Sequence, residues 1–216
     1  MVTLVTGGSG SGKSAFAEQE IVKLGTRRRI YIATMKPWDE ECRRRIERHR
    51  VMRADKQFET IECYRGLDRL EMPAAGKEGE AGNAVLLECL SNLVSNELFG
   101  TGDDDCPDRL SSQYGSATAD LVVGGIMRLM RQADDLVIVT NEVFSAGDYR
   151  RNPIGENRHE GENRYEGGKC PESGDFSGWD ESTALYLKVL GEVNCRLGAA
   201  ADRVTEVTAG IPVIIK

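Results

Sequence analysis

A glycine-rich segment near the start of the chain constrains the fold more than any other part of the sequence. Residues 7–14 read Gly-Gly-Ser-Gly-Ser-Gly-Lys-Ser, which fits the pattern G-x-x-x-x-G-K-[ST]. An apolar run, Val2–Thr6, comes directly before it, and a stretch with helical spacing, Ser14–Leu24, follows it. A strand, a glycine-rich turn and a helix in this order form a phosphate-binding loop, in which backbone N–H groups and the helix N-terminus surround phosphate oxygens. The segment therefore predicts nucleotide binding.

Separate roles follow for the polar residues of this loop and for acids on neighbouring strands. Lys13 is expected to bring its charge to the β- and γ-phosphates, and the Ser14 hydroxyl to ligate Mg²⁺. An acid at the end of a neighbouring strand usually completes such a metal site. Glu88 suits that role because it directly follows the apolar run Ala84–Leu87, and Glu142 closes a later apolar run. Ordinary strand-end carboxylates are the alternative interpretation.

Short apolar runs alternate with helical patterns along the rest of the chain. This alternation predicts an α/β fold of the P-loop NTPase type, a mostly parallel sheet with helices on both faces. Near the C-terminus, two β-branched runs flank Gly210-Ile211-Pro212, which predicts an antiparallel hairpin with its turn there. The expected strands are 2–6, 30–33, 58–61, 84–87, 136–140, 204–207 and 213–215, and the expected helices are 14–24, 39–53, 90–99, 121–133 and 186–201.

The length of the chain, 216 residues, favours a single nucleotide-binding domain over 1–216. One stretch, Ser145–Glu181, departs from the pattern, because Ile154 is its only branched aliphatic residue among many glycines, arginines and glutamates. Such a stretch buries too little apolar surface to offset the entropy of ordering it. We expect a polar, Gly-rich insertion at about 145–181, either a surface lid or a plain disordered insert.

Composition argues against several classes of partner. Lys and Arg number 28 and Asp and Glu number 35, so the net charge of −7 disfavours a protein that coats nucleic acid or anionic membrane. No apolar run approaches about 18 residues, so no transmembrane segment is expected, and Met1–Thr6 lacks the basic region of a secretory signal. Six scattered cysteines without a C-x-x-C pair, and two histidines, favour reduced thiols in the cytoplasm over a zinc site.

A second candidate site is the helix predicted around residues 40–53, where six arginines surround His49. At 3.6 residues per turn, Cys42, Ile46, His49 and Arg53 share one face of this helix. Surrounding cations disfavour an imidazolium, so we expect a neutral imidazole, which is a nucleophile whose target phosphates the arginines can hold. A solvated basic face, a nucleic-acid-binding helix and a structural histidine are the alternatives.

Several short segments, taken together in chain order, resemble one known family. It is the bifunctional adenosylcobinamide kinase/adenosylcobinamide-phosphate guanylyltransferase family of cobalamin biosynthesis. The R-I-x-x-H and T-N-E-V elements are its most specific features, whereas Phe144–Asp148 departs from the glycine-rich element that often follows T-N-E-V in the family. The segments that carry the resemblance are Val5–Ser14, Tyr31–Thr34, Arg45–Arg50, Glu62–Cys63, Leu86–Leu90, Val139–Val143, Gly191–Asn194 and Ala209–Val213.

The resemblance implies two reactions. In the first, a nucleoside triphosphate phosphorylates the aminopropanol hydroxyl of adenosylcobinamide. In the second, His49 attacks the α-phosphate of GTP, expels pyrophosphate and carries GMP to the cobinamide phosphate, which gives adenosylcobinamide-GDP. GTP and ATP would be the substrates, and Mg²⁺ would be the cofactor. Members of the family assemble as homo-oligomers, some of them trimers, so a homo-oligomer is expected here.

The resemblance and the loop motif together assign site residues. His49 and Lys13 are expected to be catalytic, and Ser14 and Glu88 to hold the metal. The expected nucleotide-binding set is Gly7, Gly8, Ser9, Gly10, Ser11, Gly12, Lys13, Ser14, Ala33, Thr34, Met35, Arg50, Val51, Met52, Arg53, Glu62 and Glu88.

Two further functions fit the residues when the resemblance is set aside. One is a small-molecule P-loop kinase without guanylyl transfer, in which His49 only binds phosphate. The other is a nucleotide-switched binding protein, in which the arginine-rich helix meets RNA or a protein partner. Covalent labelling by α-labelled GTP separates the transferase from both.

Overall fold

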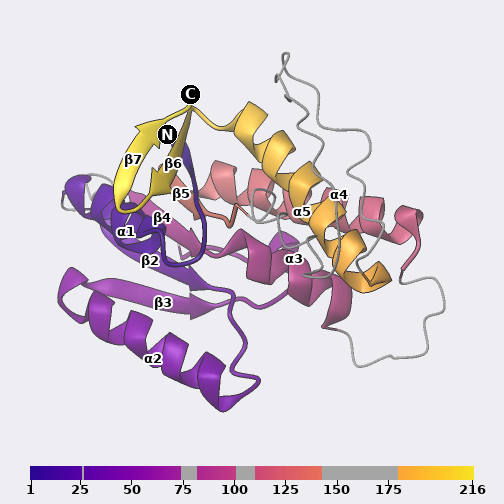
Figure 1. Ribbon diagram of the computed structural model, residues 1–216. Helices are drawn as coiled ribbons and strands as arrows, with labels where there is room; N and C mark the ends of the chain where they lie inside the picture. The colour runs from indigo at the N-terminus through magenta and orange to yellow at the C-terminus, as the bar shows by residue number, and fades with distance from the viewer. Residues whose placement is uncertain (26, 74–81, 101–109, 143–179) are drawn as a thin grey trace, which may run out of the picture.

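The computed structural model describes residues 1–25, 27–73, 82–100, 110–142 and 180–216. One seven-stranded sheet runs through it, in the order β3-β2-β4-β5-β1-β6-β7 (Figure 1). All neighbouring strands are parallel except β6 and β7, which form an antiparallel hairpin. The predicted fold class is thereby confirmed. The strands are β1 (Val2–Thr6), β2 (Arg28–Ala33), β3 (Phe58–Glu62), β4 (Asn83–Glu88), β5 (Asp135–Val139), β6 (Arg203–Thr208) and β7 (Ile211–Ile214).

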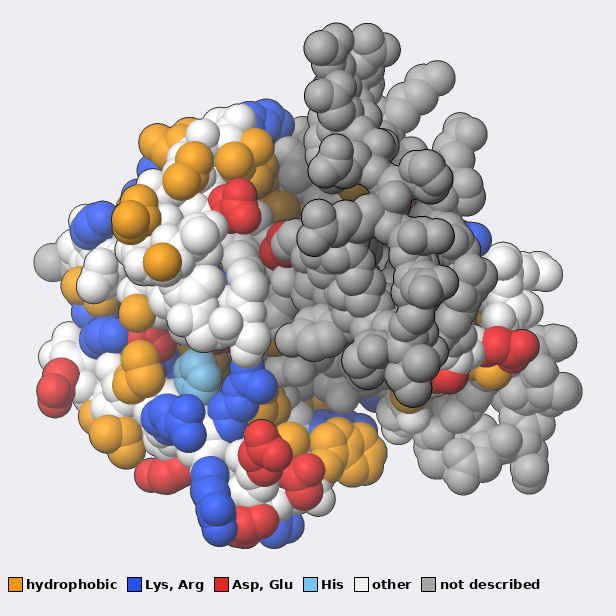
Figure 2. All heavy atoms as spheres, viewed as in Figure 1, with side chains coloured by type: hydrophobic (Ala, Val, Ile, Leu, Met, Phe, Trp, Pro, Cys, Tyr) orange, Lys and Arg blue, Asp and Glu red, His pale blue; other side chains and the backbone are white. Residues whose placement is uncertain are grey.

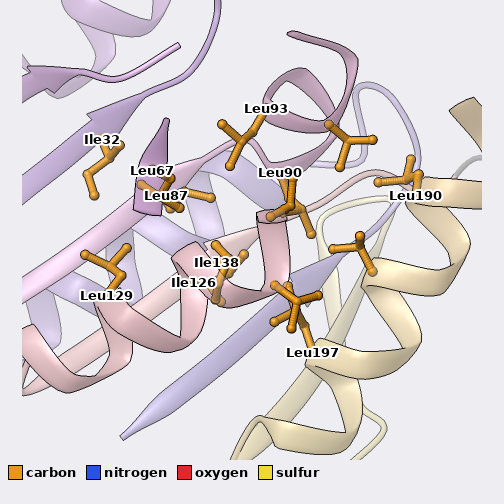
Figure 3. Packing of buried hydrophobic residues seen from close by; sticks show 14 of the residues in the cluster. Ile32, Leu67, Leu87, Leu90, Leu93, Ile126, Leu129, Ile138, Leu190 and Leu197 are labelled. Carbon is orange, nitrogen blue, oxygen red and sulfur yellow. The ribbon is translucent and has the colours of Figure 1, made fainter. Parts of the chain in front are cut away.

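Helices cover both faces of the sheet, as predicted. Helix α1 (Lys13–Lys23) packs on one face, while α3 (Leu90–Phe99), α4 (Ser112–Gln132) and α5 (Glu181–Ala200) bury the larger apolar cluster on the other face (Figure 3). Leu86 and Leu87, adjacent on β4, are both fully buried and belong to opposite clusters. This follows from the pleat of a strand, which points successive side chains to opposite faces.

Helix α2 (Glu40–Arg53) lies beside β3, away from α3, α4 and α5 (Figure 1). Its N-terminus is capped by Asp39, whose Oδ1 accepts a hydrogen bond of 2.6 Å from the Cys42 N–H. Arg53 is its one buried residue, and Cys42, Ile46 and His49 are half-buried on the same face, while its other residues are exposed. The predicted inner face of this helix is therefore confirmed. Two short 3₁₀ helices follow, η1 (Ala54–Lys56) and η2 (Leu67–Arg69).

Most element boundaries agree with the sequence prediction to within two residues, and the larger differences concern α4, α5 and the hairpin turn. Helix α4 begins nine residues earlier than expected, at Ser112, because Ser111 caps it and small residues there pack against other helices. Helix α5 begins at Glu181, after the cap residue Asp180. The hairpin turn lies at Ala209–Gly210, and Pro212 is part of β7, which tolerates a proline because it is an edge strand.

Nearly all of the predicted insertion at 145–181 lies outside the described residues. Among the helices that the structure does describe, none combines the length and apolar character needed to cross a bilayer.

Candidate active site

The phosphate-binding loop lies between β1 and α1 and rests on the β6–β7 hairpin. The Ser11 N–H donates to the Gly8 carbonyl over 3.2 Å, and the Ser11 carbonyl accepts from the Gly210 N–H over 2.8 Å. A Cβ at Gly7 would lie 2.5 Å from the carbonyl oxygen of Val207, so that only glycine fits there. The C-terminal hairpin therefore fixes the conformation of the loop.

Lys13, the first residue of α1, is buried at the mouth of this loop. Its Nζ donates to the carbonyl oxygen of Gly8 over 2.9 Å. Burial lowers the pKa of Lys13, and the opposing effect of the nearby Cys89 and Glu88 is smaller. The ammonium group is held across the loop, where an arriving phosphate can replace the carbonyl as its partner.

A cavity of about 540 Å³ opens between the start of α1, the inner face of α2 and the carboxyl ends of β2, β3, β4 and β5. This volume is in the range of small-molecule sites. Basic side chains outnumber carboxylates in its lining, which suits a polyphosphate. The predicted site residues that line it are Lys13, Ser14, Ala33, Met35, His49, Arg50, Arg53, Glu62 and Glu88.

Other predicted residues do not line the cavity. Residues 7–12 form the loop beside it. Thr34 is buried, and its hydroxyl donates to the Cys89 carbonyl over 2.8 Å and accepts from the Cys89 N–H over 2.7 Å, so it ties β2 to β4. Val51 and Met52 are 66% and 44% exposed on the outer face of α2. The structure thus places these three side chains away from the cavity.

The second candidate acid, Glu142, follows β5 next to the loop. Its backbone N–H donates to the carbonyl of Gly7 over 3.1 Å, which anchors the segment after β5 to the loop. Asn141, not Glu142, lines the cavity, and its side-chain amide donates to the Ser91 hydroxyl over 2.8 Å.

His49 sits at the inner face of α2, and Figure 2 shows the histidine side chain among basic side chains. Its Nδ1 lies 3.8 Å from Oε1 of Glu88, and Nδ1 is buried without a hydrogen-bond partner among the described residues. The sequence pattern predicted only cations around this ring. The structure adds two carboxylates, because Glu18 of α1 also lies near it.

Glu88 is held by a chain of side chains from β2 and α2. The Tyr31 hydroxyl donates to Oε2 of Glu88 over 3.1 Å, and the Arg53 guanidinium lies 3.5 Å from the centre of the Tyr31 ring. Burial, and then the charge of Glu88, raises the pKa of Tyr31, so its hydroxyl remains a donor. One buried nitrogen of Arg53, Nη1, has no hydrogen-bond partner in the described structure. Arg53 is therefore placed to receive an anionic ligand.

Sequence reasoning missed Glu18 and Tyr31. Glu18 carried a usable signal, because it lies one turn after Ser14 on the same side as the apolar Ala17 and Ile21. An acid on the buried stripe of an otherwise ordinary helix is rarely without a role.

Two sets of residues could hold a metal ion. Ser14 and Glu88, both in the cavity lining, offer the hard oxygen donors that Mg²⁺ prefers. Glu18, His49 and Glu88 each offer one atom within 4.8 Å of the others, although a lysine already pairs with Glu18. No cysteine takes part in either set.

A parallel sheet, a strand–loop–helix with a buried lysine and a basic cavity at the carboxyl ends of the strands define a P-loop nucleotide-dependent enzyme. His49 lines the same cavity from α2, close to Glu18 and Glu88.

Comparison with known proteins gives the particular family. The family model for cobinamide kinase / cobinamide phosphate guanyltransferase matches residues 3–157. The chain is 33% identical to the bifunctional adenosylcobalamin biosynthesis protein CobU of Salmonella typhimurium and 31% identical to the protein of the same name from Escherichia coli. Each alignment runs over 217 residues and covers 100% of both chains. The chain therefore belongs to the cobinamide kinase / cobinamide phosphate guanyltransferase family, as the sequence motifs predicted.

Proposed function

We propose that this protein is a bifunctional transferase of cobalamin biosynthesis. It phosphorylates the aminopropanol hydroxyl of adenosylcobinamide with a nucleoside triphosphate. It then transfers GMP from GTP to the resulting phosphate and so forms adenosylcobinamide-GDP. The full-length match to two bifunctional adenosylcobalamin biosynthesis proteins supports this function.

The observation that carries the proposal is that one cavity holds the groups which both reactions need. Lys13 and Ser14 lie on one wall, and His49 lies on the other. A nucleoside triphosphate between these walls would meet the lysine at its terminal phosphates and the imidazole at another point along the phosphate chain.

The first reaction needs charge and positioning, not a covalent intermediate. Lys13 and the N–H groups of the loop stabilise the charge that develops on the transferred phosphoryl group. Arg53, with its unpartnered buried nitrogen, holds a neighbouring phosphate.

The second reaction needs a nucleophile that can also leave. Nε2 of His49 attacks the α-phosphorus of GTP, an Nε2–P bond forms, and the bond to pyrophosphate breaks with its electron pair on the leaving oxygen. An oxygen of the cobinamide phosphate then attacks the same phosphorus. The Nε2–P bond breaks, and its electron pair returns to the imidazole.

Mg²⁺ is the proposed cofactor, because the Ser14 hydroxyl and the Glu88 carboxylate fit its preference for oxygen ligands. When bound, it neutralises charge on the phosphate oxygens of the nucleotide. Glu88 retains its bond from Tyr31 through Oε2, which orients the carboxylate.

Several properties of the whole protein belong to the same proposal. Residues 1–216 are assigned to a single domain, because the seven strands of the described residues all belong to one sheet. The protein acts on small molecules, not nucleic acid, works in the cytoplasm and assembles into a homo-oligomer, with a trimer as the expected form.

The direct test is product analysis by mass spectrometry. Purified protein is incubated with adenosylcobinamide and ATP or GTP, with and without Mg²⁺. We expect adenosylcobinamide phosphate in the presence of either nucleotide, and adenosylcobinamide-GDP only when GTP is present. Formation of adenosylcobinamide phosphate without adenosylcobinamide-GDP would favour a kinase that lacks guanylyl transfer. Absence of both products, together with RNA retention that weakens steeply with salt, would favour a nucleotide-switched binding protein.

A further inference from the structure

Glu18 is a fully buried carboxylate that neither the motif nor the cavity lining accounts for. It lies on α1 between the buried Ala17 and Ile21. A buried charge is costly unless it is paired, and Lys56 Nζ donates to its Oε2. Its other oxygen, Oε1, is buried and has no partner within the described residues. Such an orphaned acceptor indicates a missing donor.

A candidate donor lies beside it. Nδ1 of His49 is also buried without a hydrogen-bond partner in the described structure. One ligating atom of Glu18, one of His49 and one of Glu88 all lie within 4.8 Å of one another. A separation of this size is closed by a small rotation of a side chain or by one bridging water. A single hydrogen bond would therefore satisfy both orphaned atoms.

Oε1 of Glu88 is the nearer carboxylate oxygen, 3.8 Å from Nδ1, but Glu88 has other partners and Glu18 has an oxygen without one among the described residues. Glu88 lines the cavity, accepts from the Tyr31 hydroxyl and is the proposed metal ligand. Glu18 is a residue of α1 and does not line the cavity. The hydrogen bond from Lys56 holds its carboxylate in place. It therefore does not compete with the nucleotide for the cavity.

We infer that Glu18 is the positioning residue of the guanylyl transfer proposed above, on which this inference rests. Its carboxylate accepts the Nδ1 proton of His49. The hydrogen bond selects the tautomer with its lone pair on Nε2, because the partner of one ring nitrogen decides which nitrogen carries the proton. Nε2 then faces the α-phosphate.

The carboxylate of Glu18 would also stabilise the charge that the imidazole acquires during the reaction. When the Nε2–P bond forms and pyrophosphate leaves, the Nδ1 proton stays on the ring, and the guanylylated imidazole becomes a cation. The carboxylate of Glu18 compensates that charge. When the cobinamide phosphate takes the GMP, the electron pair returns to Nε2 and the ring is neutral again.

The test has a spectroscopic readout and a kinetic one. The full chain carries His159→Gln, so that a ¹⁵N-labelled His49 gives the only ring signals. We expect the ¹⁵N shifts to report the Nδ1–H tautomer. Glu18→Gln, whose amide can donate to Nδ1, should move the population toward Nε2–H. Covalent GMP formation should slow by about 10–100-fold, with little change in the KM for GTP.

Glu20→Gln is the matched control on the same helix, because Glu20 pairs with Lys23 and Arg203 on the outer side of α1. It should leave the tautomer and the rate of adduct formation unchanged. If Glu18→Gln does not fold, Glu18→Asp is the second variant. It keeps a negative charge near Lys56 but moves the carboxylate away from His49 by one methylene group. This variant should also slow adduct formation.

An unchanged tautomer and an unchanged adduct rate in the folded Glu18 variant would overturn the inference. Failure of the proposed function has a different signature, since the wild-type protein would then form no GMP adduct at all. The ¹⁵N spectrum tests the role of Glu18 even in that case.

Discussion

At the scale of single residues, Lys13 most directly links the loop to phosphoryl transfer. Its buried ammonium group donates a hydrogen bond to the Gly8 carbonyl, and a phosphate oxygen can replace this acceptor. Lys13→Ala should lower kinase turnover by about a hundredfold or more, because a charge aimed at the transferring group is lost. The measurement is the steady-state rate of adenosylcobinamide phosphorylation.

Lys23→Ala, at the exposed end of the same helix, is the control and should retain full turnover. Near-normal phosphorylation by a folded Lys13→Ala protein would refute the assignment of the phosphate-binding loop.

The sequence predicted residues whose role follows from a local motif and missed those that depend on tertiary packing. Lys13, Ser14 and His49 meet in one cavity, as expected from the loop and the inner face of the basic helix. Tyr31 and Glu18 join the site only because α2 brings Arg53 and His49 close to them. The buried stripe of α1 could signal that Glu18 has a role, but no local pattern shows which residue it meets.

Helix geometry explains why two predicted nucleotide-binding residues lie away from the cavity. Val51 and Met52 lie in sequence between two arginines of the cavity, Arg50 and Arg53. Neighbouring positions on a helix differ by about 100° in direction, so a continuous stretch of helix cannot all face one ligand. Transfer of a contiguous motif therefore overestimates the number of contacting residues.

At the scale of elements, Asn96 connects α3 to the strand ends that shape the cavity. Its side-chain amide donates to the carbonyls of Thr34, over 2.8 Å, and Tyr64, over 3.0 Å. Asn96→Ala leaves both carbonyls without these donors, and it should lower the free energy of unfolding by about 2 kcal/mol or more. Urea denaturation measures the difference. Ser95→Ala, one residue earlier, should change it by less than about 0.5 kcal/mol, and an equal loss in both variants would contradict the argument.

Asp180 at the start of α5 gives a pH-dependent prediction. Its Oδ1 accepts from the Thr183 N–H over 3.0 Å, and hydrogen bonds from Ser182 and Thr183 lower its pKa from 3.8 to about 2. A lowered pKa in the folded state means that the carboxylate stabilises the fold above about pH 4, and that this contribution is lost as the pH falls toward 2.

The Tm of the wild type should therefore exceed that of Asp180→Ala at pH 5, and the difference should become much smaller near pH 2, where the carboxylate begins to be protonated. Thermal denaturation followed by circular dichroism measures both. Asp180→Asn, which keeps an acceptor but no charge, should lack this pH dependence. A wild-type-to-Ala difference as large at pH 2 as at pH 5 would exclude the charge of Asp180 as its source.

Element types were predictable along most of the described chain, whereas element lengths were less so. Strand interiors such as Ala84–Leu87 are continuous apolar runs because both faces of the sheet are covered. The first turns of α4, with Gly115 and Thr118, lack an apolar pattern and depend on the packing of α5 against them. Their helical state is therefore decided by tertiary contacts.

At the scale of the whole molecule, β7 is an edge strand with an unusually apolar surface. Ile211 and Ile214 are 65% and 69% exposed, and Val213 and Ile215 beside them are also exposed. An apolar edge of this kind favours association with another chain. It supports the proposed homo-oligomer.

Ile214→Lys should reduce the molecular mass measured by sedimentation equilibrium from a multiple of the chain mass toward that of a single chain. Val51→Lys, at an exposed position on α2, is the control and should leave the mass unchanged. A wild-type protein that is monomeric at micromolar concentration would contradict the proposed assembly.

The central claim is that His49 carries GMP between the two substrates, and covalent labelling with α-³²P-GTP tests it most directly. The bond that forms is a phosphoramidate at Nε2, which is stable in base and labile in acid, because protonation makes the nitrogen a good leaving group. The account predicts stoichiometric, acid-labile label on the wild-type protein and none on His49→Ala, while His49→Ala still phosphorylates adenosylcobinamide. A stoichiometric, acid-labile GMP adduct on the folded His49→Ala protein would contradict it.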